Sequence, residues 1–431
     1  MTDVVVIGLT AVVVMFALGI LLEGRARRRE HAAVLARPQE TLPTLYPRIN
    51  ASACICSGAC VSVCPEGDVI AMVDGKPKLV GASACIGHSD CVRSCPVSAI
   101  ELVLGTTERA VVVPVATSTF ETTVPGLYVA GEVNGIGLIH NAVAQGVQVA
   151  AAALAGAGPH GCELDLVVVG AGPAGIGAAL EARRRGARCV VFEKGDFGGA
   201  MRSYPRQKVV MTAPLDLPGI GSIKLRRTTK EALLELFDQV VERTDLPIAE
   251  RVEVRTIQPA AEGMRVETSA GVTTAFRVIL AIGRRGTPRR LDVPGDHLPH
   301  VVYEVRDPAR YAGASVVVVG GGNSAAELSL ALAAQPGTRV TLVHRGKDFG
   351  RCKPENQRAL SRADGRLAVR LDTIVRSIGV DGVELETAGR PSTVAASHVV
   401  CCLGAELSGP WLSGLGIALR ELRGEPLVRS A

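Results

Sequence analysis

Seven of the twelve cysteines lie between Cys54 and Cys95, in two repeats of equal spacing that each end in a Cys-Pro pair. Thiolates are soft ligands that hold iron–sulfur clusters or zinc, whereas a disulfide framework is unusual in a chain of this length. Zinc needs four ligands in one tetrahedron, and these repeats lack the usual spacing of a zinc ribbon. The cysteines therefore predict iron–sulfur clusters in a reducing compartment.

Both repeats resemble the motif of bacterial two-cluster ferredoxins, Cys-x2-Cys-x2-Cys-x3-Cys-Pro, in which the last cysteine of each run serves the other cluster. The resemblance implies two ligand sets, which are Cys54, Ser57 or Cys56, Cys60 and Cys95 for one cluster, and Cys85, His88, Cys91 and Cys64 for the other.

Each repeat departs from the motif at its second ligand. The first repeat has Ser57 there, with Cys56 beside it, and the second has His88. Histidine ligands raise the potential of Rieske clusters, so His88 is expected to act in the same direction. A serine corner leaves open whether the first cluster is 4Fe-4S or 3Fe-4S. The alternative is a degenerate module that binds no metal.

A glycine fingerprint follows an apolar run at residues 166–169. Gly170 permits a tight turn, Gly172 lets a pyrophosphate approach the backbone, and Gly175 lets a helix pack on a strand. Glu193 follows about twenty residues later, where an acid bonds the ribose of a dinucleotide. Strand, glycine turn, helix and acid together predict a dinucleotide site.

A second fingerprint contains Gly320, Gly322, Asn323 and Ser324. After the next predicted strand, the ribose position carries no acid, and His344, Arg345 and Arg351 stand there instead. Basic residues at this place accommodate a 2′-phosphate, so the sequence favours NADPH over NADH. The alternative is that Arg345 is only a solvated strand end.

These motifs resemble the thioredoxin-reductase-like flavoproteins and the ferredoxin–NADP reductases built on the same scaffold. Gly198 and Gly199 follow the ribose acid as in that family, and residues 278–288 match its crossover strand. Residues 122–132 match the segment that closes the flavin site, where Gly131 and Glu132 are implied to touch the flavin's ribityl–phosphate chain. The resemblance implies FAD as the first cofactor.

The closing segment stands in an unexpected place in the chain, because it precedes the first glycine fingerprint instead of ending the fold. Residues 399–404 resemble the strand that returns to the flavin domain, and 417–428 resemble the hairpin that normally precedes the closing segment. The order therefore looks circularly permuted, which is tolerated where termini lie close together at the surface. The alternative is that 106–158 is an unrelated linker helix.

No Cys-x-x-Cys dithiol precedes the second fingerprint, where residues 303–311 stand instead. This argues against disulfide reduction by the route of thioredoxin reductases. Cys189, Cys401 and Cys402 lie in predicted apolar strands and are interpreted as core. Cys352 lies in a polar loop, and its role stays open. Hydride transfer needs no side-chain acid or base, so no catalytic residue is assigned.

The elements that must position these residues are those of an α/β protein. Forty-eight glycines, with many Ala and Val residues, suit tight strand-to-helix turns, and the two fingerprints predict two Rossmann-like domains. The net charge of +5 comes without a basic stripe interleaved with aromatics, so no nucleic-acid partner is predicted.

Val4 to Leu22 are nineteen consecutive uncharged residues, followed by four arginines among residues 25–29. At about 1.5 Å per helical residue this run spans a bilayer core of ~30 Å, and the arginines place the bulk of the chain in the cytoplasm. The sequence thus predicts a single-pass membrane protein. The alternative, a first Rossmann strand, lacks a following glycine fingerprint.

The predicted organisation comprises a transmembrane anchor (1–24), a linker (25–48), a two-cluster ferredoxin-like module (49–105), the permuted closing segment (106–160), an FAD domain (161–285), an NADP domain (286–395) and a return to the FAD domain (396–431).

The expected function is that of a membrane-anchored oxidoreductase. A hydride passes from NADPH to FAD, and single electrons pass to the iron–sulfur clusters, or the flow runs in reverse. The expected partners are NAD(P)H and an electron acceptor or donor, either a protein or a membrane quinone. Whether the protein forms a homodimer stays an open question at this point. The alternatives are a non-enzymatic redox sensor or scaffold, and a thiol/disulfide reductase using Cys352 or Cys56.

Overall fold

The computed structural model describes residues 45–426, apart from 67–68, 83–84, 86, 108–109, 136, 157, 207, 226, 285–286, 351 and 364. Within these, the chain forms two compact units. The cluster unit comprises residues 47–85 and 89–101, and the reductase unit comprises the rest. The predicted membrane segment lies outside the described residues, and none of the described helices has the length and hydropathy to cross a bilayer.

The cluster unit shows the sequence repeat in its backbone. Helices α2 (Ala59–Ser62) and α3 (Asp90–Arg93) each follow a left-handed residue, Gly58 with φ 73° and Ser89 with φ 69°. Strands β2 (Ile70–Val73) and β3 (Lys76–Leu79) form an antiparallel hairpin. The remaining strands at this end of the chain are β1 (Leu45–Ile49) and β4 (Ile100–Leu104).

The first dinucleotide domain of the reductase unit is built on a seven-stranded sheet in the described part of the chain. Its order is β13 (Ile248–Glu250), β8 (Cys189–Glu193), β7 (Leu164–Val169), β16 (Gly271–Leu280), β15 (Gly263–Thr268) and β14 (Val254–Ala260), with β6 (Leu127–Val129) also on β16. The pairs from β13 to β16 are parallel, and the last four residues of β7 are buried, as continuous apolar runs require.

The closing segment occupies a place in this sheet although it precedes β7 in the chain. Strand β6 pairs in parallel with β16, so that Leu127 lies opposite Val278 and Val129 opposite Leu280. Strand β5 (Val111–Pro114) pairs with β27 (Leu419–Leu422), and β4 pairs with β28 (Glu425–Pro426). The C-terminal arm thus lies along the stretch that leads into β6, as a permuted order requires.

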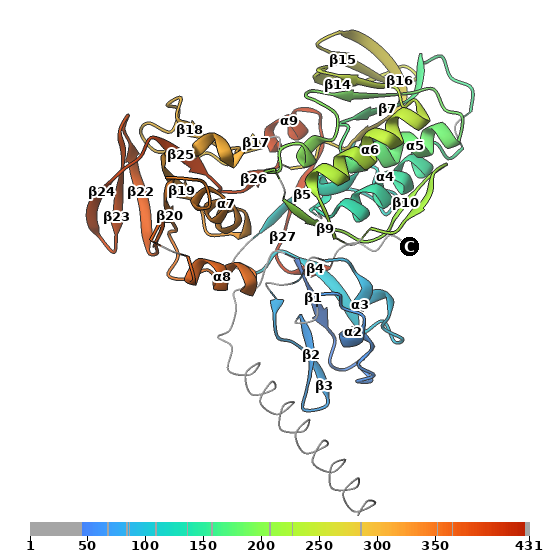
Figure 1. Cartoon of the computed structure of the whole chain (residues 1–431). Coiled ribbons are helices and arrows are strands. Elements are labelled where there is room, and N and C mark those ends of the chain that lie inside the picture. The colour runs from blue at the N-terminus through green and yellow to red at the C-terminus, as the bar shows by residue number, and fades with distance from the viewer. Residues whose placement is uncertain are drawn as a thin grey trace, which may run out of the picture. The chain divides into compact units, whose positions relative to one another are not determined.

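Helix α4 (Ile139–Ala153) follows β6 and packs on α5 (Pro173–Arg184), the helix of the first fingerprint (Figure 1). The contact depends on two glycines. A Cβ at Gly146 would lie 1.9 Å from the carbonyl oxygen of Ala174, and one at Gly177 would lie 2.4 Å from that of Val143. Only glycine allows the two backbones to approach this closely, so these positions fix α4 against the fingerprint helix.

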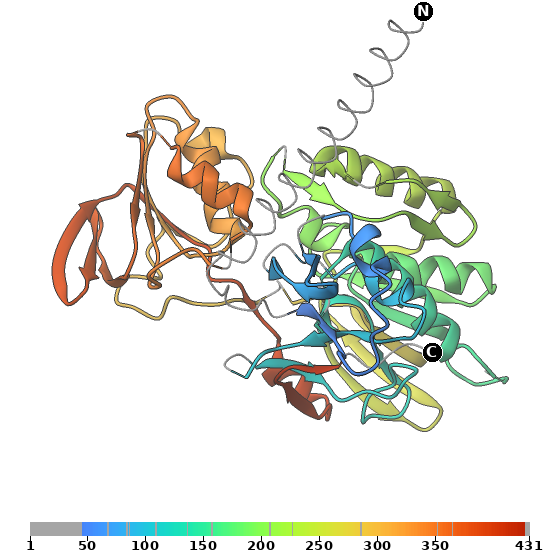
Figure 2. The ribbon, with the colours of Figure 1, turned by 90° about the horizontal axis from the view of Figure 1, so that it is seen from below.

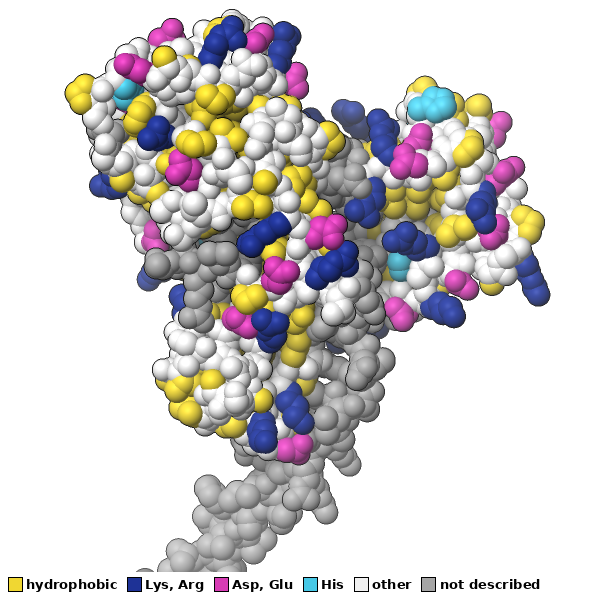
Figure 3. Space-filling model, turned by 180° about the vertical axis from the view of Figure 1, so that it is seen from behind, with side chains coloured by type: hydrophobic (Ala, Val, Ile, Leu, Met, Phe, Trp, Pro, Cys, Tyr) yellow, Lys and Arg dark blue, Asp and Glu magenta, His cyan; other side chains and the backbone are white. Residues whose placement is uncertain are grey.

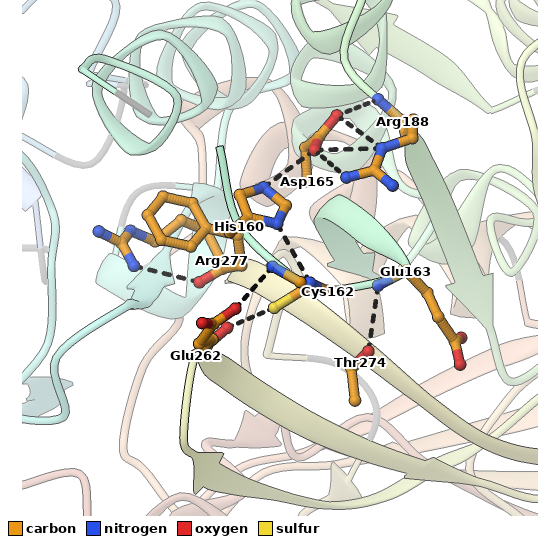
Figure 4. A network of polar contacts seen from close by, with 10 residues as sticks. His160, Cys162, Glu163, Asp165, Arg188, Glu262, Thr274 and Arg277 are labelled. Atoms are coloured by element: carbon orange, nitrogen blue, oxygen red, sulfur yellow. Dashed lines mark hydrogen bonds and ion pairs between the residues drawn. The ribbon is translucent and has the colours of Figure 1, made fainter. Parts of the chain in front are cut away.

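The loop that joins α4 to β7 is fastened by a polar network (Figure 4). Asp165 accepts hydrogen bonds from the backbone and side chain of Arg188, and His160 Nε2 lies 3.0 Å from its carboxylate. The hydrogen bonds from Arg188 hold the pKa of Asp165 below its ordinary value. The Cys162 thiol donates to the carbonyl of Glu262, and burial raises its pKa. Cys162 and His160 therefore anchor the loop and do not form a nucleophilic pair.

The second dinucleotide domain has a five-stranded parallel sheet. Its strands, in order, are β18 (Val301–Val302), β25 (His398–Cys401), β19 (Ser315–Val319), β20 (Arg339–Val343) and β21 (Leu367–Arg370). Helices α7 (Asn323–Ala333) and α8 (Pro354–Ser361) belong to it. An antiparallel sheet of β22 (Thr373–Ile378), β23 (Gly382–Thr387) and β24 (Arg390–Ala395) extends from it, orange-red in Figure 2.

Two short antiparallel strands, β17 (Thr287–Pro288) and β26 (Ala405–Glu406), lie where the chain enters and leaves this domain. The other described elements are β9 (Val209–Met211), β10 (Leu215–Leu217), β11 (Gly221–Ile223), β12 (Arg227–Thr229), α6 (Lys230–Thr244), α9 (Gly409–Gly414) and the 3-10 helices η2 (Gly131–Asn134), η3 (Gly199–Met201) and η4 (Pro308–Tyr311). On the face drawn in Figure 3, basic and acidic side chains are interspersed.

Candidate dinucleotide and iron–sulfur sites

The first glycine loop has the geometry of a phosphate cradle. Gly170 adopts φ 103°, and a Cβ there would lie 2.6 Å from the carbonyl oxygen of Ala281. A Cβ at Gly175 would lie 1.9 Å from the carbonyl oxygen of Gly170. A Cβ at Gly172 would meet no protein atom within 4 Å, directly before helix α5. Gly172 therefore leaves open space where a pyrophosphate can approach the positive end of the helix.

Glu193 is held beside this loop by backbone amides. Its carboxylate is buried and accepts hydrogen bonds from the N–H of Ala171 at 2.8 Å and of Gly195 at 2.9 Å. Gly199 completes the surroundings, because a Cβ there would lie 3.2 Å from the Cα of Gly172. Gly198 precedes it with φ 98°. The predicted residues of the first site thus come together around one loop that fits the pyrophosphate and ribose of FAD.

The closing segment reaches the same helix. Gly131 has φ 82°, and a Cβ there would lie 2.7 Å from the Cβ of Ala174 near the start of α5. Its N–H donates to the side chain of Gln145 on α4 at 2.5 Å. Sequence reasoning missed Gln145, because no motif marks it and only the packing of α4 brings it to this turn.

A half-buried cation, which sequence reasoning also missed, lies near Glu132. Arg284 Nη1 donates to the carbonyl oxygen of Val112 at 2.8 Å. Burial lowers the pKa of Arg284, and the charge of Glu132 opposes that shift. Arg284 follows the crossover strand in sequence, so it ties that strand to the permuted segment from the other side.

The second glycine loop repeats the cradle. A Cβ at Gly320 would lie 2.5 Å from the carbonyl oxygen of Cys402, whereas one at Gly322 would meet no protein atom within 4 Å. Ser324 is exposed. The side-chain oxygen of Asn323 accepts hydrogen bonds from Lys353 N–H at 2.7 Å and Asn356 Nδ2 at 2.9 Å. Asn323 therefore holds the start of α8 beside the loop.

The two basic residues after β20 lie in different surroundings. The His344 ring is buried and stacks on Phe349 with the ring centroids 5.5 Å apart, and a Cβ on Gly321 would lie 2.0 Å from that ring. Arg345 is exposed. His344 thus forms a wall behind the glycine loop, and Arg345 is the one of the two that solvent and a 2′-phosphate can reach. Arg351 lies outside the described residues.

The remaining cysteines of the reductase unit are not suited to thiol chemistry. Cys352 is fully buried. Burial raises the pKa of Cys189 and Cys402 to about 12 and that of Cys401 to about 11. Thiols with such pKa values carry almost no thiolate at neutral pH and are poor nucleophiles.

The cluster unit has a hollow lined by the first predicted ligand set. Cys54, Ser57, Cys60 and Cys95 line it, together with Ile55, Gly58, Pro77, Val97 and Ile100. Cys95 comes from the other repeat, as the ferredoxin motif implies. Ala99 N–H donates to Cys95 Sγ at 3.1 Å, and hydrogen bonds of this kind tune cluster potentials. The donors fit an iron–sulfur cluster held by three thiolates and a hydroxyl.

Three thiols of the second ligand set, those of Cys64, Cys85 and Cys91, lie near one another. Burial, with smaller contributions from the nearby thiols of Cys85 and Cys64, raises the pKa of the Cys91 thiol to about 12. His88 is buried, and together with Gly87 it is grouped with the reductase unit. Among the described residues, no three His, Cys, Asp or Glu side chains lie close enough together to hold a single metal ion.

Known protein families match the two parts of the chain. The model of a pyridine nucleotide-disulphide oxidoreductase family matches residues 167–428, and that of a 4Fe-4S dicluster domain matches residues 46–96. The closing segment lies outside both matches, as a displaced part would. These matches confirm the resemblance predicted from the glycine and cysteine motifs.

Several proteins of known name are similar to the chain. A ferredoxin–NADP reductase of Ignicoccus hospitalis is 30% identical over 59% of this chain and 82% of its own length. The bacilliredoxin reductase Bdr of Bacillus subtilis is 29% identical over 42% of this chain and 57% of its own length. The solved bacillithiol disulfide reductase Bdr of Staphylococcus aureus has 25% identity, covers 59% of this chain and 80% of that one, and gives a TM-score of 0.54.

The open space at Gly172 and Gly322 yields a prediction that separates the two sites. Alanine at either position meets no protein atom, so both variants fold, but the added methyl occupies space that a pyrophosphate needs. We expect Gly172→Ala to be purified without FAD. We expect Gly322→Ala to keep FAD and to bind NADPH about tenfold more weakly, a loss of ~1.4 kcal/mol.

Flavin absorbance and NADPH titration measure these outcomes, and Gly170→Ala is the contrasting variant. A Cβ at Gly170 meets backbone, so that substitution lowers the thermal unfolding midpoint as well. Full FAD content in Gly172→Ala would show that this loop is not the flavin site.

Proposed function

The chain belongs to the pyridine nucleotide-disulphide oxidoreductase family, and we propose that it is an NADPH-dependent flavoprotein that exchanges electrons with iron–sulfur clusters of its own cluster unit. The observation that carries this proposal is the course of the closing segment. Strand β6 belongs to the sheet of the first dinucleotide domain, and the chain runs into it from the cysteine repeats by way of β4 and β5. The cysteines are thus covalently attached to a strand of the flavin sheet.

In this proposal some residues bind the cofactors, and others position the backbone around them. FAD, when bound, takes up a hydride and releases single electrons, and iron–sulfur clusters carry single electrons. Gly172 leaves space for the pyrophosphate of FAD, and Glu193 binds the ribose of FAD. Gly322 leaves space for the pyrophosphate of NADPH. Gln145 ties Gly131 of the closing segment to α4, and Arg284 ties the end of the crossover strand to β5. The external electron acceptor or donor is a further partner, either a protein or a membrane quinone.

A second candidate function is disulfide reduction, which the names of the Bdr relatives favour. The described thiols of the reductase unit do not support it, because they are buried or have raised pKa values. Cys56 stays available to this candidate, since it is partly exposed in the cluster unit.

An anaerobic NADPH titration tests the relay against disulfide reduction. We expect NADPH to bleach the flavin and then to produce the paramagnetic resonance signal of reduced clusters. Cys60→Ser and Cys91→Ser each remove a ligand from one set, so they should keep the flavin bleaching and lose cluster signal. Cys189→Ser removes a thiol from the flavin sheet and should change neither readout.

Two results would contradict the relay. One is flavin bleaching without any cluster reduction in the unaltered protein. The other is undiminished turnover of a disulfide substrate in Cys60→Ser and Cys91→Ser, which would favour the thiol reductase. Clusters that respond to oxidants in a protein without NADPH turnover would indicate a redox sensor.

We further propose NADPH as the nucleotide, because exposed Arg345 follows β20 at the ribose position. Arg345→Glu introduces the acid that favours NADH. We expect the ratio of kcat/KM for NADPH over NADH to fall at least about tenfold, a change of ~1.4 kcal/mol. Arg339→Glu makes the same charge change at the opposite end of β20 and should leave the ratio unchanged. An unchanged ratio in Arg345→Glu would show that other residues determine the preference for NADPH over NADH.

We also propose that Val4 to Leu22 anchor the protein in a membrane with the bulk of the chain in the cytoplasm, on the strength of nineteen uncharged residues followed by arginines. The full chain is expected in the membrane fraction after an alkaline wash, and a chain lacking residues 1–24 in the soluble fraction. Recovery of both forms in the soluble fraction would exclude the anchor.

A further inference from the structure

We propose that the cluster in the hollow of the first repeat is held by three thiolates, with Ser57 at an exchangeable fourth corner, and that Cys56 is not a ligand. The proposal rests on the proposed function in one respect only, namely that the cluster unit holds iron–sulfur clusters. It assigns to this cluster an iron that leaves and returns, while the other irons stay bound.

The lining of the hollow separates the two candidate residues. Cys54, Cys60 and Cys95 line it together with Ser57, whereas Cys56 does not. The backbone explains the difference. Cys56 has φ 57°, and its counterpart in the second repeat is Gly87 with φ 77°, so this position makes the turn between two ligand positions.

Cys56 supports the neighbouring ligand Cys54 through its backbone and not through a thiolate of its own. Its N–H donates to Cys54 Sγ at 3.4 Å. The Cys56 thiol lies beside the Cys54 thiol. Ser57 is the next residue and holds the position that a cysteine occupies in the ferredoxin motif.

Ser57 is also the most accessible of the four donors that line the hollow. Ser57 and its neighbour Ile55, at 61%, are exposed, whereas Cys54 and Cys95 are partly buried and Cys60 is only 6% exposed. A serine hydroxyl is a weaker and harder ligand for iron than a thiolate, and water and chelators can reach it here. The corner iron therefore combines the weakest ligand with the best access.

The second repeat differs at the equivalent residue. His88 is 7% exposed, and imidazole is a good ligand for iron. Its corner is therefore expected to hold iron firmly. The exchangeable iron belongs to the first repeat alone, which makes the two clusters unequal in composition.

The test uses the full chain, reconstituted anaerobically with iron and sulfide, then treated with EDTA and ferricyanide. Conversion of a four-iron to a three-iron cluster releases one ferrous ion and passes one electron to ferricyanide. We expect the unaltered protein to lose about one iron per chain and to gain the resonance signal of a three-iron cluster. Ser57→Cys should keep that iron, and Cys56→Ala should behave as the unaltered protein does.

His88→Cys is the matched control for the other repeat, and it should still lose the iron. Protection by His88→Cys instead of Ser57→Cys would overturn the assignment to the first repeat. Loss of the first cluster in Cys56→Ala, with no effect of Ser57→Ala, would make Cys56 the ligand. Four firmly bound irons in both clusters, with NADPH still reducing them, would refute the exchangeable corner and leave the relay standing.

Discussion

The pairing of β6 with β16 is the constraint on which the reductase unit depends. Residues 278–280 are fully buried, and a buried strand edge without a partner would leave backbone groups unsatisfied. In this chain the partner comes from residues 127–129, ahead of the first glycine fingerprint. The flavin sheet is therefore incomplete until a segment from the N-terminal side has joined it. Two glycines on α4 and α5 then hold that segment at the glycine-loop helix.

This dependence links folding to electron transfer. Because the cysteine repeats lead directly into β5 and β6, the segment that completes the flavin sheet also carries the cluster unit. An unpermuted order would place the closing strand last and would join the cluster unit to β7, the other neighbour of β16, instead of to β6. The displaced strand thus gives a physical reason for one chain to contain both a dinucleotide domain and cysteine repeats.

Much of the fold could be predicted from local sequence, because its signals are local. The turn at Gly170, the helix after Gly172 and the acid at Glu193 are fixed by spacing within one strand-helix-strand unit. Gln145 and Arg284 carry no such signal, since their roles arise only when α4 and the crossover strand meet the closing segment. The motif predicts Asn323 and His344 as nucleotide contacts, and the structure adds that Asn323 Oδ1 accepts hydrogen bonds from Lys353 and Asn356 and that the His344 ring stacks on Phe349. These contacts involve residues outside the motif, so the motif alone could not predict them.

The identity of the fourth ligand, Cys56 or Ser57, is also beyond what local sequence can predict. Spacing alone cannot decide between neighbours, and chemical intuition favours the thiol over the hydroxyl. Backbone conformation reverses that preference, because the left-handed turn at Cys56 directs the next residue into the hollow. The two repeats share this turn but differ in the residue after it, an exposed serine in one and a buried histidine in the other. The same turn therefore presents a solvent-exposed hydroxyl in the first repeat and a shielded imidazole in the second.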